Sequence, residues 1–300
     1  MNRATLLLKL ALFGIALSFL APLSAHAQHL QPAGTKSGFV TTSDNVRIHY
    51  LEADPRSSVA KTAAILFVPG WTMPAEIWEP QLTHFAKTHR VVAMDPRSQG
   101  QSSQVAEGHY PEARARDIKA VVDQLKLAPA VLVGWSMGVA ELAAYVDQFG
   151  CDSVAGLVLV DGDAGWDIDR PLLRGFFDFA TRFEKNRREA AASFVREMYK
   201  KPQSRDYLDR ITHASLRTPT NTAMALLFAV VSTDRRSAFA KISKPTLIVA
   251  AQGPYGMIFE DMQRRIAGSQ LKVMDGVGHA LFVDEADKFN SLLDEFLKGL

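Results

Sequence analysis

Short, uninterrupted apolar runs recur along the chain. They cover residues 63–68, 91–94, 131–133, 157–160 and 246–251. Runs of this length without alternating polar positions are typical of strands that are buried on both faces, as in a parallel sheet. Amphipathic helical patterns separate them, for example over residues 111–127 and 137–149. This alternation predicts βαβ crossovers, and therefore an α/β fold with a doubly wound, mostly parallel sheet.

Two regions depart from this alternation. Residues 39–42 and 46–50 alternate on either side of the turn-forming triplet Ser43-Asp44-Asn45, which predicts an antiparallel hairpin. Residues 166–243 have no strand pattern and contain several amphipathic helical stretches. Because one crossover needs far fewer residues, we expect an inserted helical cap over the carboxyl edge of the sheet, where ligands bind in open α/β sheets. The alternative is a set of ordinary crossover helices on the sheet face.

The N-terminal segment has the pattern of a bacterial export signal. Arg3 and Lys9 accompany an apolar stretch over residues 6–20, and Ala25-His26-Ala27 gives the small-x-small pattern of a signal-peptidase site. The stretch is shorter than the about 20 residues that a spanning helix needs, which disfavours an uncleaved anchor. We expect removal of residues 1–27, and a mature domain of residues 28–300 that is periplasmic or secreted and has no stable membrane span.

Charge and cysteine content narrow the classes of partner. The chain has 34 Lys and Arg residues and 32 Asp and Glu residues. Removal of residues 1–27 takes away only Arg3 and Lys9, so 32 of each sign remain. Without a basic excess, nucleic acid is a poor candidate partner. Cys151 is the only cysteine, which excludes an intramolecular disulfide and a thiolate metal cluster.

The run at 131–133 leads directly into Gly134-Trp135-Ser136-Met137-Gly138, which has the form G-x-S-x-G. A serine on a sharp turn between a buried strand and a helix projects its hydroxyl, and side chains at the flanking glycines would clash with neighbouring backbone. The following helix offers free N–H groups and a positive dipole end where an oxyanion would form. This context favours Ser136 as a nucleophile over a serine in a plain structural turn.

Together with this motif, three further segments resemble the α/β-hydrolase family, close to its esterase, haloperoxidase-like and dehalogenase-like branch. Val68-Pro69-Gly70-Trp71 stands where the family usually has His-Gly-x. Residues 95–102 resemble its D-x-R-G-x-G-x-S loop, with Ser98 in place of a glycine. Gly276-Val277-Gly278-His279 resembles its G-x-G-H loop. The resemblance covers essentially the whole mature chain and implies the α/β-hydrolase fold.

The resemblance also implies the roles of the residues around the nucleophile. Ser136 precedes His279 in the chain, which is the order that this family uses for nucleophile and base. A neutral imidazole can take the serine proton and return it to the leaving group. We expect the backbone N–H groups of Met137 and Trp71 to form the oxyanion hole. Pro69 removes a side chain that usually stabilises this loop, but backbone donors do not depend on it.

The acid of the predicted triad has three candidates. Relatives often place it in the loop that follows the strand ending at Ala251, but Pro254 stands at that position. Some branches place the acid after the preceding strand instead, where this chain has Asp161. Because the usual position holds no carboxylate, we favour Asp161 as the residue that orients His279, with Asp163 and then Glu260 as alternatives.

These residues predict a serine hydrolase that cleaves a small to medium, largely apolar carboxylic ester through an acyl-enzyme. A metal-ligand pattern and a phosphate-binding loop are missing from the sequence, so we expect no cofactor, no metal and a small-molecule ester as the partner. Dehalogenases and epoxide hydrolases of this fold use Asp at the elbow, so Ser136 counts against them. Two alternatives remain: a perhydrolase or haloperoxidase-like activity, and a ligand-binding protein with weak turnover, which the missing carboxylate at Pro254 favours.

Overall fold

The computed structural model describes residue 32 and residues 34–54, 63–165 and 170–300, without the side chains of residues 170–173. The export signal at residues 1–27 lies outside the described residues and stays a prediction. Among the helices that are described, none combines the length and the hydrophobicity that crossing a bilayer requires.

Within the described residues, one sheet of eight strands has the spatial order β1-β2-β4-β3-β5-β6-β7-β8. The strands are β1 (Lys36–Thr41), β2 (Arg47–Ala53), β3 (Ala64–Val68), β4 (Val91–Met94), β5 (Ala130–Trp135), β6 (Val154–Val160), β7 (Thr246–Ala251) and β8 (Gln270–Met274). β1 pairs with β2 and β2 with β4 in antiparallel fashion, and the other neighbours are parallel. The predicted hairpin and the doubly wound, mostly parallel sheet are therefore confirmed.

Burial explains why apolar and polar residues do not alternate along the central strands. Every residue of β3, β4 and β5 is buried. A strand that is covered on both faces has no position at which a polar side chain would reach water.

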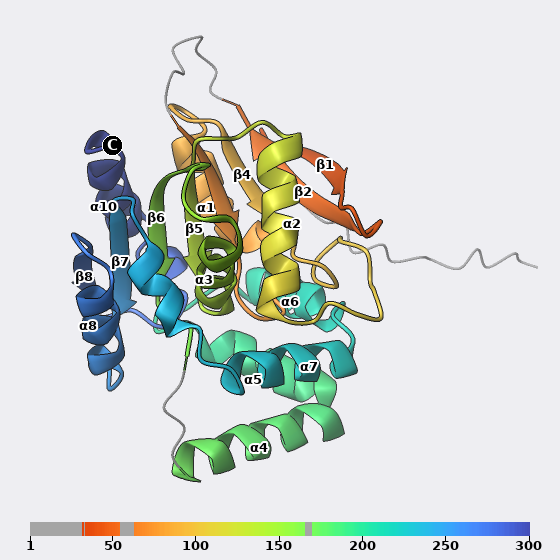
Figure 1. The fold of residues 1–300 in the computed structure, drawn as a ribbon. Coiled ribbons are helices and arrows are strands. Elements are labelled where there is room, and N and C mark those ends of the chain that lie inside the picture. Colours follow the sequence, from red (N-terminus) through yellow and green to blue (C-terminus); the bar gives the residue numbers. More distant parts are fainter. Residues whose placement is uncertain (1–31, 33, 55–62, 166–169) are drawn as a thin grey trace, which may run out of the picture. The chain divides into compact units, whose positions relative to one another are not determined.

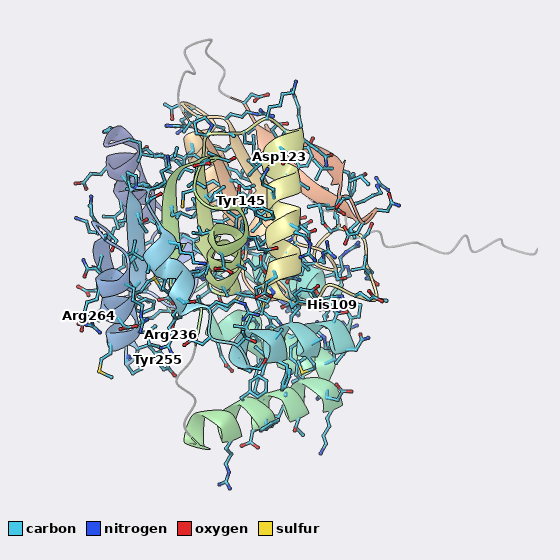
Figure 2. All side chains as sticks on the ribbon, viewed as in Figure 1. His109, Asp123, Tyr145, Arg236, Tyr255 and Arg264 are labelled. Atoms are coloured by element: carbon cyan, nitrogen blue, oxygen red, sulfur yellow. The ribbon has the colours of Figure 1, made fainter. Side chains whose placement is uncertain are left out.

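Helices cover both faces of the sheet (Figure 1). One face packs against α2 (Pro111–Gln124), α3 (Met137–Phe149), α8 (Gly256–Arg265) and the 3-10 helix η2 (Arg236–Lys241). Tyr145, labelled in Figure 2, is a buried residue of this layer. The opposite face packs against η1 (Ala75–Trp78), α1 (Glu79–Phe85), α9 (Leu281–Asp284) and α10 (Ala286–Lys298).

The remaining helices form an insertion between β6 and β7. They are α4 (Arg170–Lys185), α5 (Arg187–Glu197), α6 (Arg205–Leu216) and α7 (Thr220–Val231). Figure 1 shows them gathered at one edge of the sheet. Buried side chains of α4, α5 and α7 form a core with Trp71 and Met137, which follow the carboxyl ends of β3 and β5. The predicted helical cap is therefore confirmed, and its first predicted residues, 166–169, lie outside the described residues.

Candidate active site

Ser136 occupies the sharp turn between β5 and α3. Its backbone dihedrals are φ 56° and ψ −119°, a region that non-glycine residues rarely adopt. A Cβ atom on Gly134 would lie 2.7 Å from the carbonyl oxygen of Gly138, and one on Gly138 would lie 2.8 Å from that of Val68. Both contacts are too short for any side chain, so the two glycines of the motif are required by close backbone packing.

The hydroxyl of Ser136 lies within hydrogen-bond distance of an imidazole. The distance from Ser136 Oγ to His279 Nε2 is 2.9 Å, and His279 Nδ1 lies 2.7 Å from Asp161 Oδ2. The Asp161 side chain is 12% exposed and that of His279 is 34% exposed. The carboxylate is thus largely shielded from water, whereas the imidazole is open to a ligand.

The sheet itself holds the Asp161 carboxylate in place. Asp161 follows β6 directly and has a φ of +42°, which turns its side chain toward the neighbouring strand. Its Oδ1 accepts a hydrogen bond of 2.8 Å from the backbone N–H of Ala251, the last residue of β7. One carboxylate oxygen is therefore fixed by β7, which leaves the other for His279.

The two alternative acids lie elsewhere. Asp163 is 8% exposed, and its Oδ1 accepts a hydrogen bond of 2.7 Å from the N–H of Ala164 rather than contacting His279. Burial raises the pKa of Asp163 to about 6. Glu260 is exposed on α8, and Pro254 lies in the exposed loop after β7. Of the three candidates, the structure brings only Asp161 to the imidazole.

The loop after β3 passes directly against the nucleophile. A Cβ atom on Gly70 would lie 2.8 Å from the Cβ atom of Ser136. The backbone N–H of Trp71 donates to no described acceptor, and Met137 is the first residue of α3, whose N–H has no partner within the helix. The two N–H groups expected at an oxyanion hole are thus near the elbow and unpaired among the described residues.

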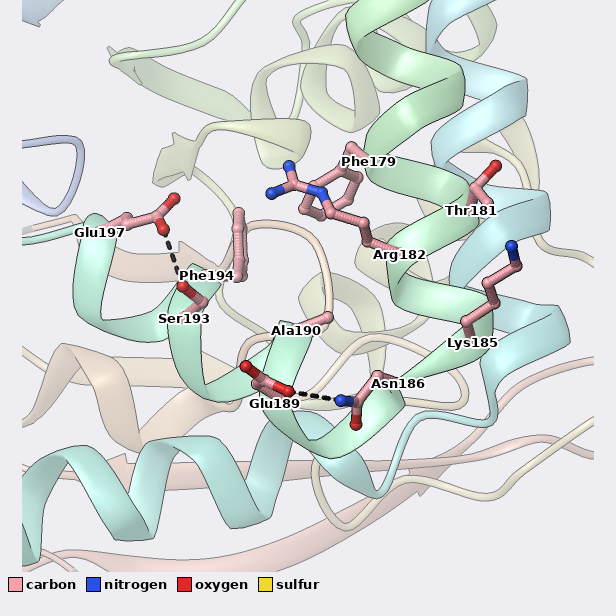
Figure 3. Close-up of a pocket in the computed structure, with 10 residues that line it drawn as sticks. All are labelled: Phe179, Thr181, Arg182, Lys185, Asn186, Glu189, Ala190, Ser193, Phe194 and Glu197. Atoms are coloured by element: carbon pink, nitrogen blue, oxygen red, sulfur yellow. Dashed lines mark hydrogen bonds between the residues drawn. The ribbon is translucent and has the colours of Figure 1, made fainter.

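The Trp71 side chain connects this loop to the cap. Its indole N–H donates a hydrogen bond of 2.7 Å to the carbonyl oxygen of Ala223 in α7. Its ring contacts three cap phenylalanines at centroid distances of 5.6, 4.8 and 5.2 Å, namely Phe179, Phe183 and Phe194. A cavity of about 400 Å³ between α4 and α5 is lined by two of these rings, Phe179 and Phe194, and by charged side chains that include Arg182 and Glu197 (Figure 3).

Two residues that position the site were missed by the sequence reasoning. A Cβ atom on Gly162 would lie 2.3 Å from the carbonyl oxygen of Ser136, so only glycine allows the turn after Asp161 to pack against the elbow. Asp284 accepts hydrogen bonds from the backbone N–H groups of Gly278 (2.7 Å) and Lys200 (2.8 Å). It therefore ties the histidine loop to the cap. In the sequence, the only sign of these two residues was Gly162 directly after the candidate acid Asp161.

A second serine–histidine–aspartate contact lies far from the elbow in the sequence. Ser37 Oγ is 2.8 Å from His49 Nε2, and His49 Nδ1 is 2.7 Å from Asp95 Oδ2. Here the histidine is only 1% exposed, and Asp95 Oδ1 also accepts a hydrogen bond from the N–H of Ala75. Ser37 lies within β1 and does not precede a helix. This arrangement joins β1, β2 and the end of β4, without the elbow that surrounds Ser136.

The chain is similar to known esterases and non-heme haloperoxidases. A bifunctional esterase/perhydrolase of Acinetobacter calcoaceticus is 41% identical over 124 residues, a match that spans 41% of this chain and only 44% of that relative. A non-heme chloroperoxidase of Streptomyces lividans is 27% identical over 87% of this chain and 100% of its own length. An esterase from Exiguobacterium antarcticum has the same fold, with a TM-score of 0.80, 23% identity, and coverage of 88% of this chain and 100% of its own.

Within the part of the chain that the structure describes, no group of three or more His, Cys, Asp or Glu side chains could hold a metal ion.

The family model described as "Alpha/beta hydrolase family" matches residues 65–292. This range includes the elbow, the histidine loop and every parallel strand, apart from the first residue of β3. The chain therefore belongs to the alpha/beta hydrolase family.

Proposed function

We propose that the protein is a serine hydrolase that cleaves carboxylic esters through an acyl-enzyme. The observation that carries the proposal is the uninterrupted series of contacts from Ser136 Oγ to His279 (2.9 Å) and from His279 to Asp161 (2.7 Å). Nucleophile, base and orienting acid must be linked in this way for proton transfer. The position of Ser136 at the N-terminus of α3, beside the unpaired N–H groups of Trp71 and Met137, adds support.

The geometry suits the following sequence of steps. Ser136 Oγ attacks the ester carbonyl carbon while His279 Nε2 takes the hydroxyl proton, and the Trp71 and Met137 N–H groups stabilise the oxyanion. The tetrahedral intermediate then expels the alcohol, which receives the proton from His279. Water attacks the acyl-enzyme in the same manner, which releases the carboxylic acid and restores the serine. Asp161 accepts the Nδ1–H throughout and stabilises the imidazolium.

The cap side of the site favours a small to medium, largely apolar ester, with lactones as further candidates. Phe179, Phe183 and Phe194 gather around the Trp71 ring, whose backbone N–H is the proposed oxyanion donor. Aromatic rings exclude water from a site and contact apolar groups over a large area. Phe179 and Phe194 also line the cavity between α4 and α5.

Perhydrolysis is the second candidate, because a relative that is 41% identical over 124 residues is named a bifunctional esterase/perhydrolase. In that reaction the acyl group on Ser136 passes to hydrogen peroxide instead of water, so that a carboxylic acid and hydrogen peroxide give a peracid and water. The ligand-binding alternative depended on the missing carboxylate at Pro254. The contact between Asp161 and His279 supports turnover instead.

Export is part of the proposal and rests on the sequence alone. Arg3 and Lys9, the apolar stretch and the Ala25-His26-Ala27 site are the features that support a cleaved signal. The periplasm or the medium would then be the place of action. Expression of the full chain in a bacterial host, followed by fractionation and N-terminal sequencing, tests it: a mature protein that retains residues 1–27 would contradict it.

The hydrolase proposal is tested with p-nitrophenyl esters of increasing acyl length, using wild type and Ser136→Ala. We expect multiple turnovers with the wild type, a loss of at least about 10³-fold in Ser136→Ala, and labelling of Ser136 by a fluorophosphonate. A peracid formed from acetate and hydrogen peroxide, detected by bromide oxidation, would indicate the perhydrolase reaction. Labelling without repeated turnover would favour the binding protein, and no labelling with no turnover would overturn the proposal.

A further inference from the structure

One buried amide side chain is hydrogen-bonded to the backbone before and after Trp71. Gln99 has no exposed surface, and it follows β4 in the loop that resembles the family's D-x-R-G-x-G-x-S segment. Its Nε2 donates to the carbonyl oxygens of Gly70 (3.0 Å) and Met73 (2.9 Å), and its Oε1 accepts from the N–H of Thr72 (3.0 Å). Gln99 therefore makes three hydrogen bonds to the backbone on both sides of Trp71.

An ion pair holds Gln99 in this orientation. Arg114 Nη1 donates to Gln99 Oε1 (2.8 Å) and to Glu141 Oε1 in α3 (2.9 Å), and neither charged side chain has exposed surface. Since a guanidinium only donates, the Gln99 atom beside it must be the amide oxygen. The amide nitrogen must then face the loop carbonyls, so the two ends of the Gln99 amide cannot be exchanged. The network links the Trp71 loop to the helix that follows the nucleophile.

The geometry of the peptide unit gives this network a consequence for catalysis. The carbonyl of Gly70 and the N–H of Trp71 belong to one planar, trans peptide, so they point in opposite directions. A donor that holds the Gly70 carbonyl therefore also fixes the direction of the Trp71 N–H. Gly70 has no side chain to restrict rotation of this peptide, and it lies against Ser136, where a Cβ atom would be 2.8 Å from the serine Cβ.

We propose that Gln99 is a positioning residue that fixes the Gly70–Trp71 peptide so that the Trp71 N–H points to the developing oxyanion. Arg114 and Glu141 keep Gln99 in place. The inference rests on the proposed function, because it needs an oxyanion at Ser136. In this chain the side chain that holds the loop after β3 comes from the loop after β4.

The test compares Gln99→Leu with Gln81→Leu as a matched control. Gln81 is also fully buried and also donates from Nε2 to a carbonyl, that of Phe282, and to Asn290 Oδ1, but none of its described hydrogen bonds goes to the Trp71 loop. Removing an oxyanion donor outright costs about 10²–10³ in kcat, so a misdirected donor is expected to cost about 10–100-fold. With p-nitrophenyl acetate, we expect this loss in kcat for Gln99→Leu, with KM nearly unchanged.

A transition-state analogue separates positioning from a general loss of structure. Phenylboronic acid forms a tetrahedral adduct with the nucleophile, so its inhibition constant should rise with the loss in kcat, while inhibition by the product acetate stays unchanged. Gln81→Leu should lower the melting temperature by a similar amount with much smaller changes in kcat and in boronate inhibition. Equal kcat losses in the two variants, or a Gln99→Leu loss confined to KM, would overturn the inference.

Gln99→Glu covers the case in which the leucine variant does not fold. The carboxylate keeps the acceptor for Thr72 and Arg114 but cannot donate to Gly70 and Met73. We expect kcat to fall at least as far as the lower bound given above, and full activity would contradict the role of the donors. A wild type that neither turns over esters nor reacts with the fluorophosphonate is a different result, because it rejects the proposed function itself.

Discussion

The indole N–H of Trp135 lies 2.9 Å from the carbonyl oxygen of His279, so the residue before the nucleophile holds the backbone of the base. The two rings are also in contact, with centroids 5.0 Å apart. Trp135 ends β5 and is 1% exposed. The variable position before the serine in G-x-S-x-G thus contributes, in this chain, to the distance between Ser136 and the imidazole.

Replacement of Trp135 by phenylalanine tests this contact. Trp135→Phe keeps an aromatic ring but leaves the His279 carbonyl without its donor. We expect kcat to fall by about 3–30-fold through a less well placed imidazole, and the free energy of unfolding to fall by about 1–2 kcal/mol. The measurements are ester turnover and urea unfolding.

Trp78→Phe is the matched control for this prediction. Trp78 is also fully buried and stacks on Phe282, but its indole N–H has no hydrogen-bond partner among the described residues. Its replacement therefore costs packing without a hydrogen bond. Equal kcat losses in the two variants would show that the Trp135 N–H does not position His279.

Asp161→Asn should reduce kcat by about 10³–10⁴-fold. An amide presents no charge to the imidazolium, and it can hold the ring in the wrong tautomer. Asp163→Asn is the control, because Asp163 is two residues away and does not contact His279. Its turnover is expected to stay within about threefold of the wild type at pH 8, where activity is compared on short p-nitrophenyl esters. Undiminished turnover in Asp161→Asn would remove Asp161 from the triad.

The fold was predictable because its determinants are local. A strand covered on both faces needs a continuous apolar run, and the run at 246–251 matches β7 (Thr246–Ala251). The pattern at 137–149 likewise matches α3 (Met137–Phe149). The sequence also placed Ser136 at a turn between strand and helix, since glycine spacing marks a close backbone approach.

The contacts between distant loops were not predictable in the same way. The sequence offered three carboxylates as the partner of His279. Asp161 takes this position because β6 and β7 are neighbours, which brings its side chain to the Ala251 N–H. Gln99 and Gly70 are also joined only by the folded chain. Packing decides which buried polar groups become neighbours and form such hydrogen bonds. These contacts therefore produce no periodic signal in a single sequence.

The contact of Ser37 with His49 and Asp95 predicts a selective result with fluorophosphonates. The Ser136→Ala variant should not be labelled, and the Ser37→Ala variant should be labelled at Ser136 at the wild-type rate. Ser37 lies in a strand, without the oxyanion donors of a helix N-terminus, so its contact with an imidazole does not make it reactive. The measurement is mass spectrometry of labelled peptides from both variants. A labelled Ser37 in Ser136→Ala would contradict the prediction.

Asp163 should make the protein less stable as the pH rises from about 4 to about 6. Burial raises its pKa to about 6 in the folded state from the ordinary value of 3.8. Below that ordinary value both states hold the proton. Between the two values, the unfolded chain loses its proton while the folded chain keeps it, so the free energy of unfolding falls. A difference of about two pH units corresponds to at most about 3 kcal/mol.

Urea unfolding of wild type and Asp163→Asn at pH 4 and pH 7 measures this effect. The amide can still accept from the Ala164 N–H but does not titrate, so the variant should gain stability relative to the wild type as the pH rises. Asp234→Asn is a control that should show little change over this range, because the hydrogen bond from Arg236 lowers the pKa of Asp234 to about 2. That lowered value stabilises the wild type by a nearly constant amount above about pH 4 and is lost only as the pH falls toward 2, so the stability difference between Asp234→Asn and the wild type should hardly change from pH 4 to pH 7. A gain for Asp163→Asn that is no larger at pH 7 than at pH 4 would show that this carboxylate ionises as easily in the folded protein as in the unfolded chain.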